Sequence, residues 1–82
     1  MNERRVAILG VIVENPASVD ALNAILHECK EWIIGRMGIP YKERSISIIS
    51  IVMDAPAEII SSLSGKIGML DGVTCKATYS KL

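Results

Sequence analysis

The 82-residue sequence has no phenylalanine, one tryptophan, two tyrosines, one histidine and two cysteines. Two cysteines are too few for the disulfide framework that stabilises many small secreted domains. The few aromatic residues lie outside the strands predicted below to be central, which excludes RNA recognition by base stacking on those strands. The single histidine, His27, leaves little material for a catalytic triad, and we expect no catalytic residues.

The sequence also lacks a charge excess and a long apolar run. Nine basic and nine acidic residues give a net charge of zero, so no basic surplus is available for a nucleic-acid backbone. The longest apolar run, residues 6–13, is far shorter than the roughly 20 residues that span a bilayer. Arg4 and Arg5 precede this run, but Glu14 ends it and no signal-peptide cleavage motif follows. We therefore expect a cytoplasmic protein that binds neither membrane nor nucleic acid directly.

Hydrophobic residues, in contrast, make up half of the chain. The length predicts a single domain over residues 1–82, and a domain of this size has only a small core. Small domains often gain further stability from a partner subunit. The surplus of apolar residues therefore predicts a homo-oligomer.

The first half of the chain predicts a strand, a helix and a second strand. Residues 6–13 are rich in valine and isoleucine and are typical of a strand. Asn15 is a good helix cap and Pro16 suits a first helical turn. The pattern predicts an amphipathic helix of about four turns, whose apolar positions are Val19, Leu22, Leu26, Cys29 and Ile33. Residues 34–39 predict a second strand that ends before Pro40, because proline cannot donate to a sheet ladder.

The second half repeats this order. Residues 40–44 form the connection and residues 45–53 predict a third strand. The stretch "DAPAE" places Asp54, Pro56 and Glu58 where a second helix would begin. The apolar stripe of that helix consists of Ile59, Ile60, Leu63 and Ile67. Residues 73–79 alternate between apolar and polar and predict an edge strand.

The resulting order predicts an α+β fold, the ferredoxin-like βαββαβ sandwich, with both helices on one face of a four-stranded antiparallel sheet. The expected strand order is 4-1-3-2. The first and third strands are apolar on both sides, although two helices can cover only one face. The first strand has Val6, Ile8 and Ile12 on one side and Ala7, Leu9, Val11 and Val13 on the other, and the third has Ile46, Ile48 and Val52 against Ile49, Ile51 and Met53. Roughly half of these side chains would be left on the face without helices. A second copy of the chain is the simplest cover, giving a homodimer or homotetramer.

Cysteine and histidine give little support for a resident metal. His27 lies opposite the apolar stripe of the first helix, and Cys29 lies about 200° further round the helix. The two side chains therefore cannot bind one ion within a subunit, and we expect neither a metal site nor a cofactor. Cys29 and Cys75 occupy apolar positions and should behave as small buried hydrophobic residues. The absence of a C-x-x-C motif counts against copper transport.

The stretch "SSLSGKIG" contains glycine and lysine but lacks the order and context of a phosphate-binding loop. Within a helix, Ser61, Ser64, Gly65 and Gly68 would form a stripe of small residues. Glycine is unfavourable in a helix by about 1 kcal/mol relative to alanine, so the stripe suggests close approach of a ligand or another backbone at Gly65 and Gly68. The alternative is an ordinary solvent-facing surface.

The stretch "GRMGIPYKER" connects the second and third strands. Arg36 stands inside a strand next to Gly35 and Gly38, and glycine in a strand often marks a bulge or a close backbone approach. Arg36 and Arg44 could hold an anionic ligand with Tyr41 as a wall, or they could form a subunit contact. The alternative is a hairpin connection without further function.

Four stretches, "RVAILGVIVEN", "IIGRMGIPYKERSISIISIVMDAP", "LSGKIG" and "GVTCK", together resemble the iron-only hydrogenase system regulators. The resemblance implies a short protein with an ACT-like, ferredoxin-like domain, similar in fold to the C-terminal domain of nickel-responsive repressors. Such domains assemble through their sheets and sense small ligands. The resemblance also implies a role near hydrogenase maturation or expression, such as that of a transcriptional regulator.

Two departures from the repressors shape the functional expectation. Nickel-responsive repressors carry an N-terminal DNA reader and bind nickel through several histidines, whereas here about five residues precede the first predicted strand and the chain has one histidine, so we expect neither DNA binding nor nickel sensing. We therefore expect a non-enzymatic regulatory domain that acts as a homo-oligomer and binds a small-molecule effector or a partner protein. One alternative is a metal-responsive module in which His27 meets ligands from another subunit. A second is a small enzyme that uses Arg36 and Arg44 on an anionic substrate.

Overall fold

The structure is a computed structural model that describes residues 3–81. Its helices and strands are β1 (Arg4–Val13), α1 (Val19–Glu28), β2 (Ile33–Tyr41), β3 (Ile46–Pro56), α2 (Ala57–Gly68) and β4 (Val73–Tyr79). Three short 3-10 turns lie between them: η1 (Pro16–Ser18), η2 (Lys30–Trp32) and η3 (Lys42–Arg44).

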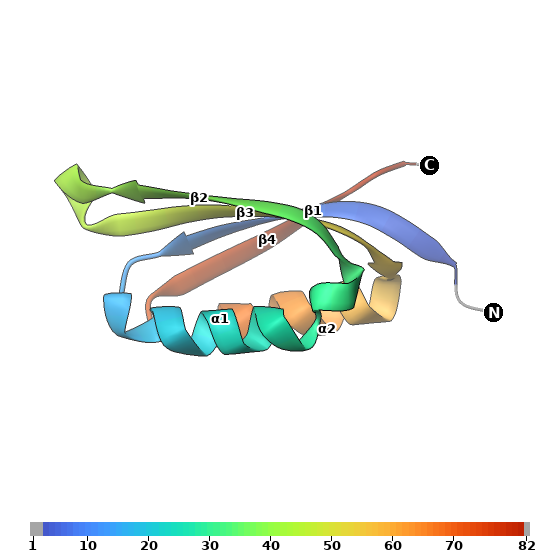
Figure 1. Ribbon diagram of the computed structural model, residues 1–82, viewed down its shortest axis with the longest axis horizontal. Coiled ribbons are helices and arrows are strands. Elements are labelled where there is room, and N and C mark those ends of the chain that lie inside the picture. Colours follow the sequence, from blue (N-terminus) through green and yellow to red (C-terminus); the bar gives the residue numbers. More distant parts are fainter. Residues whose placement is uncertain (1–2, 82) are drawn as a thin grey trace.

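The elements form two layers, with the sheet on one side and both helices on the other (Figure 1). The strand order is β2-β3-β1-β4, and each neighbouring pair is antiparallel. This is the predicted order 4-1-3-2 read from the other edge. The α+β sandwich with two helices on one face is therefore confirmed, with β1 and β3 at the centre.

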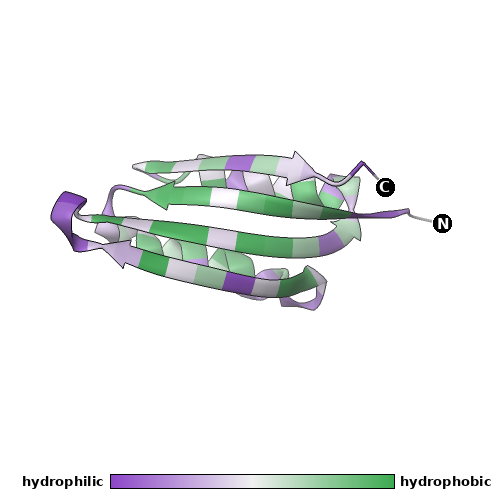
Figure 2. Cartoon of the chain, turned by 90° about the horizontal axis from the view of Figure 1, so that it is seen from above, coloured by the Kyte–Doolittle hydropathy of each residue, from purple (hydrophilic) through white to green (hydrophobic). Residues whose placement is uncertain are grey.

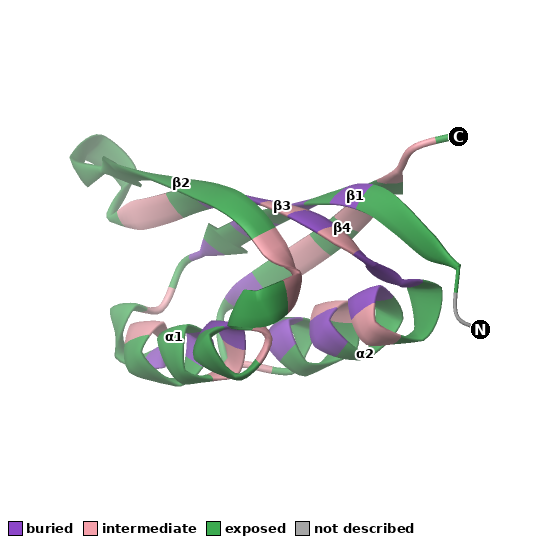
Figure 3. Cartoon of the chain, turned by 45° about the vertical axis from the view of Figure 1, so that its right-hand side comes forward, coloured by how far each residue is buried: buried purple, intermediate pink, exposed green. Residues whose placement is uncertain are grey.

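The core lies between the sheet and the helices, where buried residues of both layers meet (Figure 3). Alternate residues of β1 and β3 point into it because successive side chains of a strand point to opposite faces. The largest fully buried side chains are Leu9, Val11, Val13, Leu22, Ile51, Met53, Ile60, Leu63 and Ile67. Deleting one of them would leave a cavity and destabilise the fold by roughly 2–5 kcal/mol.

The first helix is shorter than the sequence predicted. Asn15 does act as a cap, since its Oδ1 accepts a hydrogen bond from the Ala17 N–H at 3.0 Å, but the turn it caps is η1. The α-helix itself has 10 residues and ends at Glu28, followed by η2. Ile33 belongs to β2, where it pairs with Met53. Tertiary pairing with β3 thus overrides the helical spacing of this residue.

Both strands next to a proline are longer than predicted. β2 continues through Pro40 to Tyr41, because an edge strand has one side without a ladder and tolerates proline. β3 continues to Pro56, so Asp54 lies in a strand rather than at a helix start. Asp54 pairs with Val6, and β1 starts two residues earlier than expected, so Arg5 and Arg4 supply strand partners for Ala55 and Pro56.

The β2–β3 hairpin extends beyond the helices (Figure 1). It makes the molecule elongated, with extents of 44 × 20 × 17 Å. At its tip, η3 is followed by Ser45 in the left-handed conformation, with φ of 54°. Neither of the helices in the described residues is long and apolar enough to cross a membrane.

Candidate functional site

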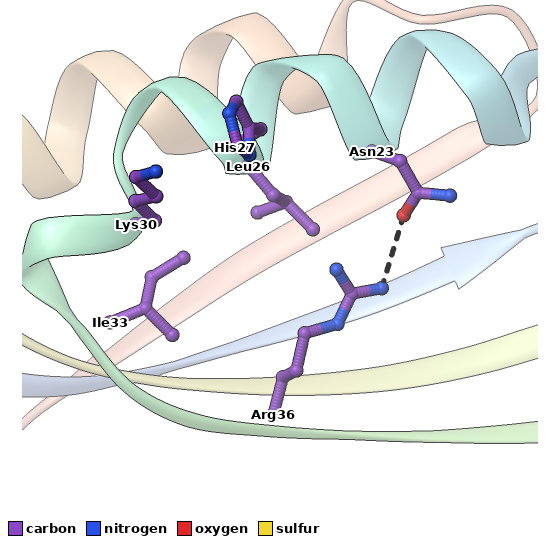
Figure 4. A pocket seen from close by; sticks show the side chains of 6 residues that line it. All are labelled: Asn23, Leu26, His27, Lys30, Ile33 and Arg36. Atoms are coloured by element: carbon purple, nitrogen blue, oxygen red, sulfur yellow. Dashed lines mark hydrogen bonds between the residues drawn. The ribbon is translucent and has the colours of Figure 1, made fainter.

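A pocket of about 290 Å³ lies between α1 and the first half of β2 (Figure 4). Its lining residues are Asn23, Leu26, His27, Lys30, Ile33 and Arg36. Leu26 points from the helix towards the strand and is almost fully buried, whereas Ile33 points from the strand towards the helix and stays partly accessible. Polar and basic groups surround this apolar part.

A bulge in β2 brings Ile33 and Arg36 to the same side of the sheet. Ile33 pairs with Met53, whereas Gly35 already pairs with Val52, so Ile34 is an extra residue in the ladder. Without it, residues three apart would lie on opposite faces. Because of the bulge, Arg36 pairs with the buried Ile51 and points towards α1.

The helical side of the pocket follows from sequence spacing. Counted from Asn23, the other three lining residues of the helical side lie three, four and seven positions later: Leu26, His27 and Lys30. This spacing places all four along one side of α1 and its continuation into η2. His27 lies in the last turn of α1. His27 is exposed, as predicted, but it belongs to this pocket.

The basic side chains of the pocket have no acidic partner in the described chain. Arg36 Nη2 donates to the Oδ1 of Asn23 at 3.2 Å, and no carboxylate lines the pocket. Across residues 3–81 the one ion pair joins Arg4 and Asp54 at 3.8 Å, on the opposite face of the sheet from the pocket. Lys30 and Arg36 therefore present positive charge that the described residues leave uncompensated.

The sheet surface that the helices leave uncovered, which we call the open face, is the second candidate region. Register assigns to it the even-numbered residues of β1 and β3 and the odd-numbered residues of β2 from Gly35 onwards. Its exposed large apolar side chains are Val6, Ile8, Ile12, Met37, Ile39, Tyr41 and Ile48. Figure 2 shows that this apolar character runs along the central strands and β2. The predicted apolar face therefore exists and is exposed within a single chain.

The structure separates the residues predicted for the "GRMGIPYKER" site. Arg36 points towards α1, whereas Tyr41 pairs with Ile46 and lies on the open face, where its hydroxyl donates to Glu43 Oε2 at 3.2 Å. Arg44 lies in η3 at the hairpin tip. Gly38 pairs with Ile49 and faces the helix layer. Within one chain, Arg36, Tyr41 and Arg44 thus do not surround a common ligand.

The small-residue stripe of α2 faces open space. A Cβ atom added at Gly65 or Gly68 would meet no other atom within 4 Å. Ser64 turns partly inward, where its hydroxyl lies 3.6 Å from the Sγ of Cys75. No backbone in the described chain approaches the stripe, so a contact there would need another molecule.

Both cysteines are free and pack against the core. Burial raises the pKa of the Cys75 thiol, an effect that the hydrogen bond from Ser64 partly opposes. Cys29 is half-buried, while His27 is exposed. Among residues 3–81 no group of three histidine, cysteine, aspartate or glutamate side chains could hold a metal ion.

Sequence reasoning identified Arg36 but missed its partners. The spacing of Asn23, His27 and Lys30 could have indicated a common polar side of the helix. That this side meets Arg36 depends on the bulge at Ile34, and the two glycines of β2 predicted only that a bulge could occur. The geometry therefore places Arg36 at the α1–β2 pocket, apart from Arg44 at the hairpin tip.

Comparisons with known proteins identify the family. No curated protein matches the chain. A solved structure, "uncharacterized protein TM1266 from Thermotoga maritima", has a TM-score of 0.92 and 34% identity over 96% of this chain and 100% of that one. A formyltetrahydrofolate deformylase from Pseudomonas putida KT2440 has a TM-score of 0.63 and 15% identity over 89% of this chain and 28% of that one, a likeness of fold alone. Residues 5–77 match the TM1266-like family, described as "Iron-only hydrogenase system regulator, putative", and the chain belongs to this family.

Proposed function

We propose that this protein is a non-enzymatic regulatory domain of an iron-only hydrogenase system, assembled from identical subunits through the open face and responsive to a small effector. The observation that carries the proposal is the exposed apolar surface on β1, β2 and β3. Ile8 is 47% exposed and Met37 is 62% exposed in the single chain. An apolar patch that covers most of a sheet face is typical of an interaction surface.

A second copy is the occupant that fits this surface best. Between the ends of the sheet, the open-face positions of β2 and β3 carry no charge. Lys76 on β4 and the Arg4–Asp54 pair lie at the margins. A neutral apolar face is complementary to itself, as a two-fold interface requires. A sheet of this length also offers the roughly 800 Å² per partner of a standard interface.

The pocket supports a binding role rather than catalysis. His27, the only histidine of the chain, lines it without a carboxylate or thiol beside it. General acid–base catalysis usually needs such a neighbour to set protonation and orientation. The groups present instead favour recognition by charge and hydrogen bonds.

Analytical ultracentrifugation tests the assembly. At micromolar concentration the wild-type protein should sediment as a dimer or tetramer. Ile8→Glu and Ile48→Glu each place a charge at the centre of the open face and should give folded monomers, because burying an unpaired charge is strongly unfavourable. Ala24→Glu puts the same charge on the exposed surface of α1 and should sediment like the wild type. A monomeric wild-type protein would contradict the proposal.

A further inference from the structure

We propose that the α1–β2 pocket is a binding site for a small organic anion, a carboxylate attached to a short branched apolar chain. The inference rests on the proposed function, since it names the effector class of the regulatory domain. It joins three features of one pocket: basic side chains without an ion-pair partner, the apolar side chain of Ile33, and a guanidinium that is hydrogen-bonded to Asn23.

The charge of the pocket selects the sign of the ligand. Lys30 and Arg36 approach it from two different elements, and His27 adds a ring that can donate a hydrogen bond. Glu28 and Glu31 follow His27 and Lys30 in the chain, but neither lines the pocket or forms an ion pair with its basic side chains in the described residues. A ligand carboxylate would supply the missing partner and form charge-assisted hydrogen bonds.

The position of Arg36 favours a planar anion. Its Nη2 bonds to Asn23 at 3.2 Å, which holds one end of the guanidinium against α1. The remaining donors of the fork are left for another acceptor, and a carboxylate matches their geometry. Figure 4 shows the guanidinium between Asn23 and the strand, on the side of the pocket where Leu26 also lies.

Size and lining limit the rest of the ligand. The pocket volume of about 290 Å³ is at the lower end of the range for ligand sites. Ile33, which is partly buried, offers aliphatic contact beside the charged groups, whereas Leu26 is almost fully buried in the core and contributes little. A chain of four or five carbons, branched at its end, would lie against Ile33 while its carboxylate meets Arg36, and Lys30 adds positive charge to the same pocket.

The pocket and the open face lie on opposite sides of the sheet, so binding can be measured independently of assembly. Arg36 pairs with the inward Ile51, whereas Ile8 and Ile48 point outward. The folded monomer expected for Ile8→Glu should therefore keep the pocket. The two proposals then fail or succeed separately.

The test titrates 4-methylpentanoate into ¹⁵N-labelled protein and follows amide chemical shifts, with the neutral 4-methylpentanamide as control. Saturable shifts should centre on Lys30, Arg36 and the last turn of α1, and the amide should bind at least tenfold more weakly. Arg36→Gln and Lys30→Gln should each weaken binding about tenfold, while amide signals away from the substituted residue stay unchanged. Added salt should also weaken binding. Arg44→Gln, which removes an arginine outside the pocket, should bind like the wild type.

Three outcomes would overturn the anion site: no saturable shift up to about 10 mM, equal affinity for the amide, or wild-type affinity in both pocket variants. Binding retained by monomeric Ile8→Glu supports the site. If the wild-type protein is monomeric but binds the anion, the assembly proposal fails and the anion site stands. If the wild-type protein is an oligomer that does not bind the anion, the anion site fails and the assembly proposal stands.

Discussion

Asn15 and Asp71 lie 56 residues apart and are joined by a hydrogen bond of 2.6 Å from the Asn15 amide to the Asp71 carboxylate. Around this bond, Ser18 Oγ donates to the Asp71 carbonyl at 2.7 Å and the Glu14 N–H donates to the Gly72 carbonyl at 2.7 Å. The loops that precede α1 and β4 are thereby fixed to each other. This end of the sandwich is held by polar contacts, whereas its centre is held by the apolar core.

Asn15→Ala should destabilise the protein by roughly 1–2 kcal/mol, because it removes both the cap of η1 and the bond to Asp71. Urea unfolding monitored by circular dichroism measures the change. Asn23→Ala is the matched control, since that amide bonds only Arg36 at the surface, and we expect a change within about 0.5 kcal/mol. Equal effects in the two variants would show that the loop connection is not stabilising.

Gly72→Ala should be more damaging, with a loss of roughly 2–3 kcal/mol. Gly72 has a φ of +68°, and a Cβ atom there would lie 2.7 Å from the Cβ of Asn15 and 2.9 Å from its backbone nitrogen. Both the conformation and the space exclude a side chain. Urea unfolding of the Gly72→Ala variant measures the loss. An unfolding midpoint equal to that of the wild type would show that the two loops can move apart without a loss of stability.

Gly65→Ala should have the opposite sign and stabilise the protein by about 1 kcal/mol. This glycine lies within α2, where an added Cβ meets nothing within 4 Å. The substitution also tests the predicted contact at the small-residue stripe. If another molecule packs closely against Gly65, the alanine variant would show weaker assembly or ligand response instead of a plain gain in stability.

Alkaline pH should destabilise the protein through Cys75. Because burial raises the pKa of this thiol, the folded state favours its neutral form. The contribution to stability is complete below the ordinary value of 9.0 and is lost as the pH rises through the folded-state pKa. Cys75→Ala should remove this part of the decline between pH 7 and pH 10, while Cys29→Ala should retain it. Identical pH slopes in wild type and Cys75→Ala would contradict the assignment.

A single subunit should hold no tightly bound zinc, nickel or iron. His27 is exposed at the α1–β2 pocket and Cys29 packs against the core, so the two do not converge. Elemental analysis after dialysis against a chelator measures the metal content. Stoichiometric metal that disappears in His27→Ala would instead support a site shared between subunits.

The sequence pattern predicted most of the sheet because apolar residues on both faces of the central strands leave a clear signature. Leu9 and Ile8 are adjacent and both apolar, and the structure places one in the core and the other on the open face. The limits of β2 and β3 were less predictable. Pro40 and Pro56 mark strand ends in most contexts, but pairing with Ser47 and Arg4 keeps both in extended conformation. Such long-range pairing has no local signal.

The candidate site was harder to predict than the fold, because one inserted residue decides it. The extra position at Ile34 determines that Arg36 faces α1 and not the open face. Regular strand alternation would place Arg36 on the same face as Ile34 and Gly38. That spacing does not indicate that Arg36 contacts Asn23. A basic residue in a strand can be recognised from sequence, but its face after a bulge requires coordinates.

The outer half of the β2–β3 hairpin has consequences for the dynamics of this fold. The residues from Ile34 to Ser45 are exposed, and neither helix extends beneath the tip (Figure 1). Backbone hydrogen bonds without buried side chains around them open at low free energy, so amides there should exchange with solvent much faster than those of β1. If the open face is covered by another subunit, their protection should rise with protein concentration. The hydrogen-exchange rates of the β2–β3 hairpin amides would then report whether the subunits are assembled.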